Sequence, residues 1–342
     1  MGRFLVKRTL NMIPLLLGIT FLSFLVMSLV PGNFLSNLKM NPAISPQLIK
    51  EMEAQFGLDQ PLLVRYGKWL WAVLHLNLGV SLAYHVNVTS LIATRALNTI
   101  ILSASSMLFA WVVAIPIGIV VAVNQDSIWD RVLSFAAFFG MSVPNFFLAF
   151  LMMYLALQTG WFPVGGTYSV DYAQLTMWGK VGDRINHLLL PVFVLGIAGT
   201  ASLMRLMRSQ ILEIKNSDYV RTARAKGLSE RVVIYKHVLR NALNPFVTMA
   251  GYGLADLLGG AALVEAVMNL QGLGLLLLDA VRSLDIYLVM GSVLMGTVLL
   301  LVGNLLADMA LVAVDPRVDF SSLGSQYGDR SRGSQWPPPH RE

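Results

Sequence analysis

The side chains in this sequence that are best suited to chemistry with a partner lie in one short basic stretch between two long apolar runs. It reads Asp218-Tyr-Val-Arg-Thr-Ala-Arg-Ala-Lys-Gly227 and continues through Leu228-Ser-Glu-Arg231 to Asn244-Pro245. Guanidinium and ammonium groups donate charge-assisted hydrogen bonds to carboxylates and phosphates. A dense polar element placed where hydrocarbon ends suggests a docking surface for a soluble partner. The simpler alternative is an ordinary basic loop beside a membrane.

The spacing of caps in this stretch predicts two short helices joined by a glycine. Ser217 or Asp218 can cap a first helix that runs through Lys226, and Gly227 supplies a left-handed stop. Ser229 can cap a second helix that leads toward the next apolar run. The expected element is therefore helix, glycine hinge, helix.

Small and basic residues alternate along the first of these helices. Ala223 and Ala225 would let the helix press closely into a groove, while the basic side chains around them make charged contacts. This spacing favours docking over a loop that only carries charge. The candidate contact residues are Asp218, Tyr219, Arg221, Ala223, Arg224, Ala225, Lys226, Gly227 and Arg240.

The composition places the chain in a membrane. Its 342 residues are 56% hydrophobic and 13% charged, and the mean hydropathy is +0.64, which is outside the usual range of soluble domains. The net charge of +6 comes from basic residues beside apolar segments, so it orients the protein and meets anionic headgroups of the lipid bilayer, and no nucleic-acid partner is expected. No cysteine is present and the five histidines are scattered, so we expect neither a bound metal nor an enzymatic site.

Apolar runs of about 20 residues, the length that crosses a bilayer, predict six transmembrane helices. The first follows a basic leader but is too long for a signal peptide, so we expect it to be retained. The six runs are approximately Thr9–Val30, Thr99–Val123, Val132–Leu157, Leu188–Met207, Pro245–Val264 and Tyr287–Val312.

Lysine and arginine gather before the first run and after the fourth, which places both sites on the cytoplasmic side. Six spans then put the N and C termini in the cytoplasm. The expected organisation is a first helix with an external segment (1–98), a transmembrane core (99–314) that holds the basic loop at about 216–244, and a cytoplasmic tail (315–342) that is disordered at its end.

The external segment contains amphipathic pieces of its own. Ser45-Pro46 begins a predicted capped helix that ends at Gly57, and Tyr66, Trp69 and Trp71 contribute to a second apolar face. Aromatic stripes at helical spacing usually bury themselves. The segment is either a small lid packed on the spans or a surface that receives a delivered substrate.

A few polar or helix-breaking residues fall inside or beside the spans, where they are costly. Asp256 and Glu265 are either pathway contacts for a charged substrate or structural groups that cap a helix or bond a neighbouring subunit, and Asp308 is expected to be structural. Pro144 should break or bend the third span, either at the border of a pathway or as a static kink.

The basic loop resembles the EAA-type coupling loop of ABC importer permeases, in the form found in the oligopeptide and dipeptide permease family. The resemblance covers most of residues 1–320. The motifs that carry it are Asp218–Gly227 with His237–Pro245, Gly57–Pro61 with Tyr66, Leu78–Ser81, Ser142–Phe146, Trp161–Pro163, Glu265, Gly272–Gly274, and Asn304 through Asp308 to Asp315–Arg317.

The resemblance implies the type I ABC importer permease fold and a division of labour in the bacterial cytoplasmic (inner) membrane. Such a subunit pairs with a second, similar permease, docks its loop on two ATP-binding subunits, and receives substrate from an extracytoplasmic binding protein. This chain contains no G-x-x-x-x-G-K-[ST] motif, so ATP and Mg would be bound by the partner subunits and this chain would hold no cofactor and no ATPase site.

The substrate expected from the resemblance is a di- or oligopeptide, with nickel complexes or glutathione as alternatives. Three departures from the family pattern bear on substrate more than on coupling: Asn77 stands where aspartate is usual, Gln271 replaces a proline before Gly272, and Leu284 replaces an arginine before Asp285. Two other classes stay open: a secondary transporter that runs without ATP, for which no convincing internal repeat is present, and a membrane scaffold.

Overall fold

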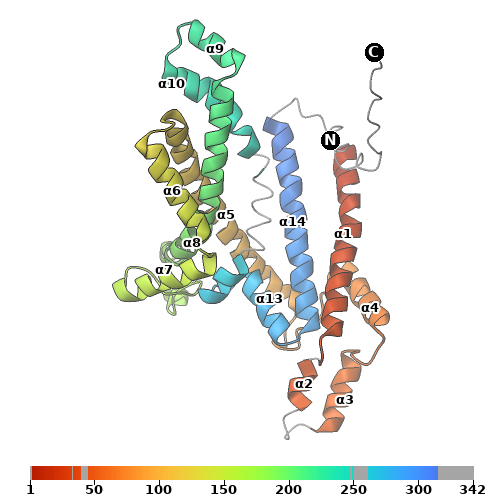
Figure 1. The fold of residues 1–342 in the computed structure, drawn as a ribbon. Helices are drawn as coiled ribbons and strands as arrows, with labels where there is room; N and C mark the ends of the chain where they lie inside the picture. Colours follow the sequence, from red (N-terminus) through yellow and green to blue (C-terminus); the bar gives the residue numbers. More distant parts are fainter. Residues whose placement is uncertain (1, 33, 40–44, 247–248, 250–260, 315–342) are drawn as a thin grey trace, which may run out of the picture.

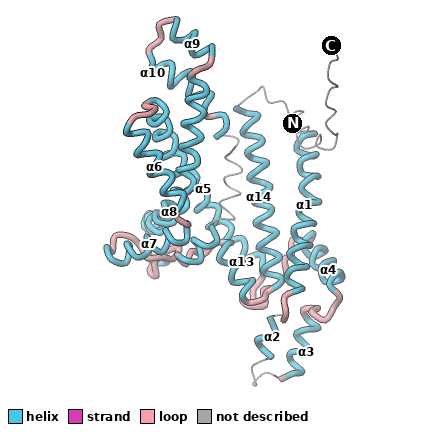
Figure 2. The backbone as a smooth tube through the Cα atoms, viewed as in Figure 1, coloured by secondary structure: helices cyan, strands magenta, loops and turns pink. Residues whose placement is uncertain are grey.

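The described parts of the chain are built from helices (Figure 1). The computed structural model describes residues 2–32, 34–39, 45–246, 249 and 261–314, and only helices, turns and loops are drawn there (Figure 2), which confirms the all-α prediction. In chain order the elements are α1 (Gly2–Leu29), α2 (Phe34–Lys39), α3 (Pro46–Gln55), α4 (Leu62–Leu74), α5 (Val88–Val123), α6 (Ile128–Ser142), α7 (Asn145–Thr159), the 3₁₀ turn η1 (Tyr172–Gln174), α8 (Met177–Lys215), α9 (Asp218–Ala225), α10 (Glu230–Val232), the π-helix η2 (Val233–Val238), α11 (Leu239–Ala242), α13 (Leu273–Arg282) and α14 (Ile286–Val314).

Four of the described helices, α1, α5, α8 and α14, are long and apolar enough to cross a membrane, and the bent pair of α6 and α7 makes up to five. The first and sixth predicted spans match α1 and α14 closely. The second and fourth are longer than predicted, because α5 begins at Val88 and α8 runs from Met177 to Lys215. A helix does not have to end where hydrocarbon ends, and Thr176 caps the extended start of α8 by accepting a hydrogen bond from the Gly179 amide.

One predicted boundary does not coincide with a helix end, and one predicted span is described only in part. The expected domain boundary at residue 98 falls inside α5. Most of the predicted fifth span lies outside the described residues, although residues 261–267 are helical.

The predicted third span is broken near its middle, as the position of Pro144 predicted. The segment forms two helices, α6 and α7, that bend by 99°. Pro144 lies at the break, as expected of a residue that has no amide hydrogen for the helix ladder. Val143 before it has extended backbone angles, φ −87° and ψ 121°, because the proline ring disfavours the helical region in the preceding residue.

The longest helices, α5 and α8, pack along one another and form the centre of one half of the molecule (Figure 1). They approach closely at Gly118 of α5, where an added Cβ would lie 2.6 Å from Cβ of Met207. The helices from α9 to α11, which we call the loop element, follow the end of α8. We call the end of the molecule that carries them the α9 end. The opposite end carries α2 and α3, and we call it the α3 end.

Helices α1 and α14 run side by side in opposite directions in the other half (Figure 1). Near the α9 end, Nη2 of Arg8 lies 2.8 Å from Oδ2 of Asp308. Near the α3 end, Phe24 and Met290 share a buried cluster. The ion pair gives Asp308 the structural role that was expected of an acidic group near a membrane boundary.

The capped helix predicted after Ser45 is present as α3. The Ser45 hydroxyl accepts a hydrogen bond from the Leu48 amide at 3.2 Å, and Gly57 ends the turn with a φ of +63°. Both features are local, so the sequence was sufficient to predict them.

Candidate functional site

Helix α9 divides its side chains between the interior of this chain and solvent. Val220 and Ala223 are buried, and they share a cluster with Met207 of α8 and Val233 of η2. Ala225 is exposed. The expectation that Ala223 presses into a partner was therefore wrong, because Ala223 packs inside its own chain. Only Ala225 of the two alanines is available for a close contact outside it.

The end of α9 is a Schellman motif built on Gly227. The Gly227 amide donates to the Arg224 carbonyl at 2.9 Å, and the Leu228 amide donates to the Ala223 carbonyl at 3.4 Å. Gly227 has a φ of +78°, as this motif requires, and glycine adopts that angle without a steric cost. The predicted left-handed stop is confirmed.

Arg224 connects α9 to α8 and α10 through hydrogen bonds. Its Nε and Nη2 donate to the two carboxylate oxygens of Glu230 at 3.0 and 2.7 Å, and its Nη1 donates to the Lys215 carbonyl at 3.3 Å. These bonds to Arg224 hold the pKa of Glu230 below its ordinary value and raise the pKa of Arg224. The guanidinium of Arg224 is held within the chain while its side chain stays 33% exposed, so the expected contact with a partner stays a prediction.

The second helix of the element is not uniform. After the short α10, residues Val233–Val238 form the π-helix η2, and α11 follows. Nδ2 of Asn241 donates to the Tyr219 hydroxyl at 2.8 Å and so joins the end of this helix to α9. Arg240 is exposed on α11. A π-helix is rare and frequently marks a functional site.

The predicted side-chain caps of both helices are not formed. The Ser217 hydroxyl donates to the Ile214 carbonyl at 2.7 Å instead of accepting from α9, and Ser229 makes no side-chain cap bond. Tertiary packing of Val220 and Val233 therefore fixes these helices more than capping does.

Beside these internal contacts, exposed residues of the loop element form a surface that we call the docking surface. It combines polar or basic side chains with three exposed apolar ones, Leu228, Val232 and Tyr235. These three were not predicted as site residues. Their spacing of four and three residues, which is typical of one helix face, was the signal that could have found them. The docking surface comprises Asp218, Tyr219, Arg221, Ala225, Lys226, Gly227, Leu228, Val232, Tyr235 and Arg240.

Glu265, one of the candidate pathway residues, is fully buried, and its carboxylate lies at the N-terminus of α13. Its carboxylate accepts hydrogen bonds from the Thr99 hydroxyl at 2.8 Å and from the Leu275 amide at 3.0 Å. An anion at a helix N-terminus satisfies amides that have no partner inside the helix. The geometry matches the structural alternative, in which Glu265 caps a helix.

The Gly272-Leu-Gly274 motif is explained by the same carboxylate. A Cβ at Gly272 would collide with the Glu265 carboxylate, and one at Gly274 would lie 2.5 Å from Cα of Ala262. Helix α13 itself was not predicted, and Thr99 carries no sequence signal because it is distant in the chain from Glu265.

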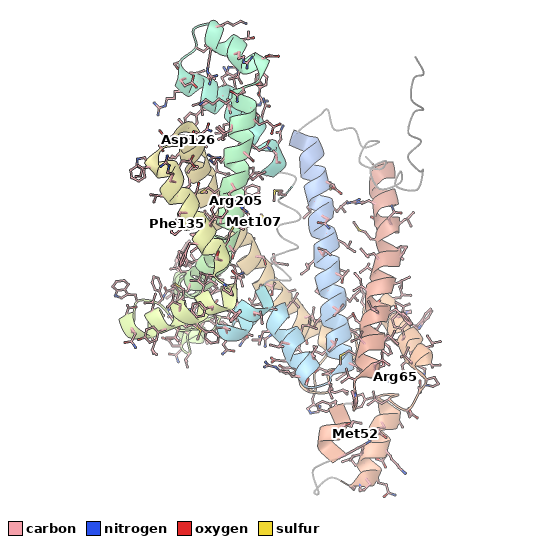
Figure 3. All side chains as sticks on the ribbon, viewed as in Figure 1. Met52, Arg65, Met107, Asp126, Phe135 and Arg205 are labelled. Carbon is pink, nitrogen blue, oxygen red and sulfur yellow. The ribbon has the colours of Figure 1, made fainter. Side chains whose placement is uncertain are left out.

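An apolar cavity of about 410 Å³ lies beside the break at Pro144 and is lined by residues of both α6 and α7. Val143, Phe139 and Phe193 are among the side chains that line it. Figure 3 labels Phe135 of α6 and Arg205 of α8, the helices that contribute lining side chains such as Leu133 and Met204. Both the pathway and the kink readings of Pro144 fit this position. Asp256, the remaining candidate, lies outside the described residues.

Two family models cover most of this sequence. The model described as "Binding-protein-dependent transport system inner membrane component" matches residues 114–320. The model for the N-terminal part of the same class of membrane component matches residues 1–103.

Curated relatives match over nearly their whole length. The chain is 39% identical to the oligopeptide transport system permease protein AppB of Bacillus subtilis (strain 168), over 94% of this chain and 100% of that protein. It is 35% identical to the dipeptide transport system permease protein DppB of Escherichia coli (strain K12), over 93% of this chain and 99% of that protein.

A solved structure shares the fold. The chain resembles an inward-facing conformation of the MetNI methionine ABC transporter with a TM-score of 0.52 and 20% identity, over 66% of this chain and 96% of that one. At this identity the similarity concerns the fold, and it agrees with the predicted type I permease architecture.

Proposed function

Because the chain belongs to the binding-protein-dependent transport system inner membrane components, the permease subunits of ABC importers, we propose that its docking surface couples ATP hydrolysis to transport. A permease of this class works with ATPase subunits and a substrate-binding protein. In this proposal the docking surface lies in the cytoplasm, together with both termini. Two ATP-binding subunits hold ATP and Mg and contact the docking surfaces of this chain and of a second, homologous permease.

The observation that carries the proposal is the rigid construction of the loop element. The Gly227 turn and the ion pair of Arg224 with Glu230 join α9 to α10, and the bond of Asn241 to Tyr219 joins α9 to α11. An element fixed in this way transmits a displacement of its surface to α8, which continues directly into it (Figure 1). A loop that only oriented the protein by charge would need no such contacts.

The proposed substrate is a di- or oligopeptide. The two relatives described above are named for oligopeptide and dipeptide transport. The two permeases would form one half of the pathway each, and an extracytoplasmic binding protein would deliver the peptide. This chain contributes no ATPase site of its own.

The coupling proposal is tested with Ala225→Trp in the reconstituted complex of both permeases, both ATPase subunits and the binding protein. A large side chain at this exposed position should disturb the contact and lower peptide-stimulated ATP hydrolysis by about tenfold or more, the effect of losing an interface hot spot. Val170→Trp is the matched control, because Val170 is also exposed but precedes the other end of α8. Equal activity of both variants and the wild type would contradict coupling through α9.

The substrate proposal is tested in the same complex by uptake of labelled dipeptides and longer peptides, with glutathione and a nickel complex as competitors. Peptide uptake that excess peptide alone suppresses supports the proposal. Uptake of glutathione or the nickel complex in its place would keep the importer class and change the substrate. Uptake that continues without ATP would contradict the class as well.

A further inference from the structure

Helix α4 lies beside the middle of a membrane-spanning helix, although it belongs to the segment between the first two spans. The Tyr66 hydroxyl donates to the Leu17 carbonyl at 3.3 Å and lies 3.0 Å from the hydroxyl oxygen of Thr20. Thr20 precedes the end of α1 at Leu29 by nine residues, which is about 13 Å along a helix. Half of a hydrocarbon core is about 15 Å. Tyr66 therefore reaches close to the middle of the apolar part of α1.

The rest of the packed face of α4 lies against the first turns of a second spanning helix. Trp69 is 3% exposed and shares a buried cluster with Phe24 of α1 and with Ile286 and Met290 of α14. Ile286 is the first residue of α14 and follows the buried Asp285. The Trp69 ring thus lies at the level of the membrane-spanning parts of α1 and α14. In Figure 1, α4 lies alongside α1, whereas α2 and α3 lie beyond its end.

The opposite face of α4 is also apolar, and nothing in the described chain covers it. It forms a continuous stripe at helical spacing with Gly67 in its centre. The large side chains of the stripe, with their exposed fractions, are Leu63 (69%), Val64 (46%), Trp71 (67%) and Leu74 (71%). A helix that is apolar on both its packed and its open face is typical of a membrane interior.

The charged residues of α4 are arranged as a lipid environment requires. The Arg65 guanidinium carbon lies 5.4 Å from the centre of the Phe24 ring, and Arg65 lines a cavity of about 120 Å³ between α4 and the rest of the chain (Figure 3 labels Arg65). Intramembrane arginines face protein or a polar cavity in this way. Lys68 is exposed at the edge of the stripe, where a long side chain can extend to the headgroups.

Exposed apolar side chains of α1 lie beside α4. Phe21 and Leu22 of α1, near the Tyr66 contact, are 36% and 60% exposed. Lipid is the surrounding of an exposed face on a spanning helix. We propose that α4 is embedded in the leaflet on the α3 side, where Leu63, Trp71 and Leu74 contact lipid acyl chains. This inference does not depend on the coupling or substrate proposals.

Site-directed spin labelling tests the proposal, since the chain has no native cysteine. Single cysteines replace Leu63, Trp71 or Leu74 in the full importer complex, reconstituted in nanodiscs of phosphatidylethanolamine and phosphatidylglycerol. Leu22→Cys on α1 is the control for lipid, and Lys50→Cys, exposed on α3, is the control for water. The collision rates of each label with oxygen, which concentrates in lipid, and with a water-soluble nickel chelate are measured.

We expect the α4 labels to resemble the Leu22→Cys label, with an oxygen-to-nickel accessibility ratio several-fold above that of Lys50→Cys. A ratio like that of Lys50→Cys would overturn the proposal and make α4 an aqueous lid or a receiving surface. Low accessibility to both reagents would also overturn it, because a partner protein would then cover the stripe. All three positions are exposed, so their replacement leaves the core intact, and agreement among them guards against one perturbed variant.

Discussion

Gly227 shows how one residue fixes the direction in which the chain leaves α9. An added Cβ at Gly227 would meet no atom within 4 Å, so there is space for a side chain. Glycine is needed there because of the backbone angle, a φ of +78°. The constraint is therefore conformational and not steric crowding by a neighbour. Substitutions at this position should rank by how well each residue tolerates the left-handed region.

Replacement of Gly227 by asparagine should be tolerated better than replacement by valine. Asparagine enters the left-handed region at a small cost, whereas a β-branched residue is a strong outlier there, and the left-handed conformation costs about 1–2 kcal/mol for ordinary residues. We expect Gly227→Asn to keep most of the peptide-stimulated ATP hydrolysis of the complex and Gly227→Val to lose most of it. Equal effects of the two substitutions would show that the backbone angle is unimportant for coupling.

Gly272 is constrained differently, by the buried carboxylate of Glu265. Gly272→Ala should push the methyl group into that carboxylate and destabilise the protein by about 1–3 kcal/mol, the usual cost of overpacking. Gly296→Ala is the matched control, because a Cβ at this glycine of α14 would meet nothing within 4 Å. Thermal unfolding of the complex in nanodiscs should show a lower Tm for Gly272→Ala alone. An unchanged Tm would mean that Glu265 moves aside at little cost.

At the scale of elements, the bend between α6 and α7 has two possible origins. Pro144 disfavours a continuous helix, but both arms also pack against α8. Because a straightened segment would lose the packing of one arm, we expect tertiary contacts to hold the bend even without proline.

Pro144→Ala should therefore leave the bend in place. Two arms of 15 residues that meet at a 99° bend place Ile128 and Thr159 roughly 30 Å apart, whereas a straight helix would separate them by about 47 Å. Spin labels on Ile128→Cys and Thr159→Cys in an otherwise cysteine-free chain report this distance by pulsed electron resonance. A shift toward the longer distance in Pro144→Ala would assign the bend to the proline.

At the scale of the whole molecule, the loop element and the α2 and α3 helices lie at opposite ends of the bundle (Figure 1). This separation suits a subunit that meets an ATPase at one end and a delivered substrate at the other. The basic side chains of the loop element favour the cytoplasm for its end by the positive-inside rule, in line with the proposed orientation.

The proposed orientation predicts labelling of engineered cysteines from opposite sides of the membrane. In intact cells a membrane-impermeant maleimide should modify Val170→Cys and leave Lys226→Cys unmodified, and inverted vesicles should reverse the pattern. Both side chains are exposed, and the permeases are expressed without the ATPase subunits so that no docked subunit covers Lys226. Modification of Lys226→Cys in intact cells would reverse the topology and remove the docking surface from the ATPase side.

The sequence by itself determined the features that depend on neighbours along the chain. The apolar runs predicted α1 and α14, the cap at Ser45 predicted the start of α3, and Gly227 predicted the end of α9. The break at Pro144 was also predictable. Each of these follows from hydrophobic length or from backbone angles that one residue imposes on the next.

Only the tertiary structure decided how such elements use their faces. It turned Ala223 inward and left Ala225 open, and it occupied Arg224 with Glu230. It joined Thr99 to Glu265, 166 residues apart, and it placed Tyr66 beside the middle of α1. These contacts depend on which surfaces meet in space, and side-chain type or spacing along one helix does not specify that.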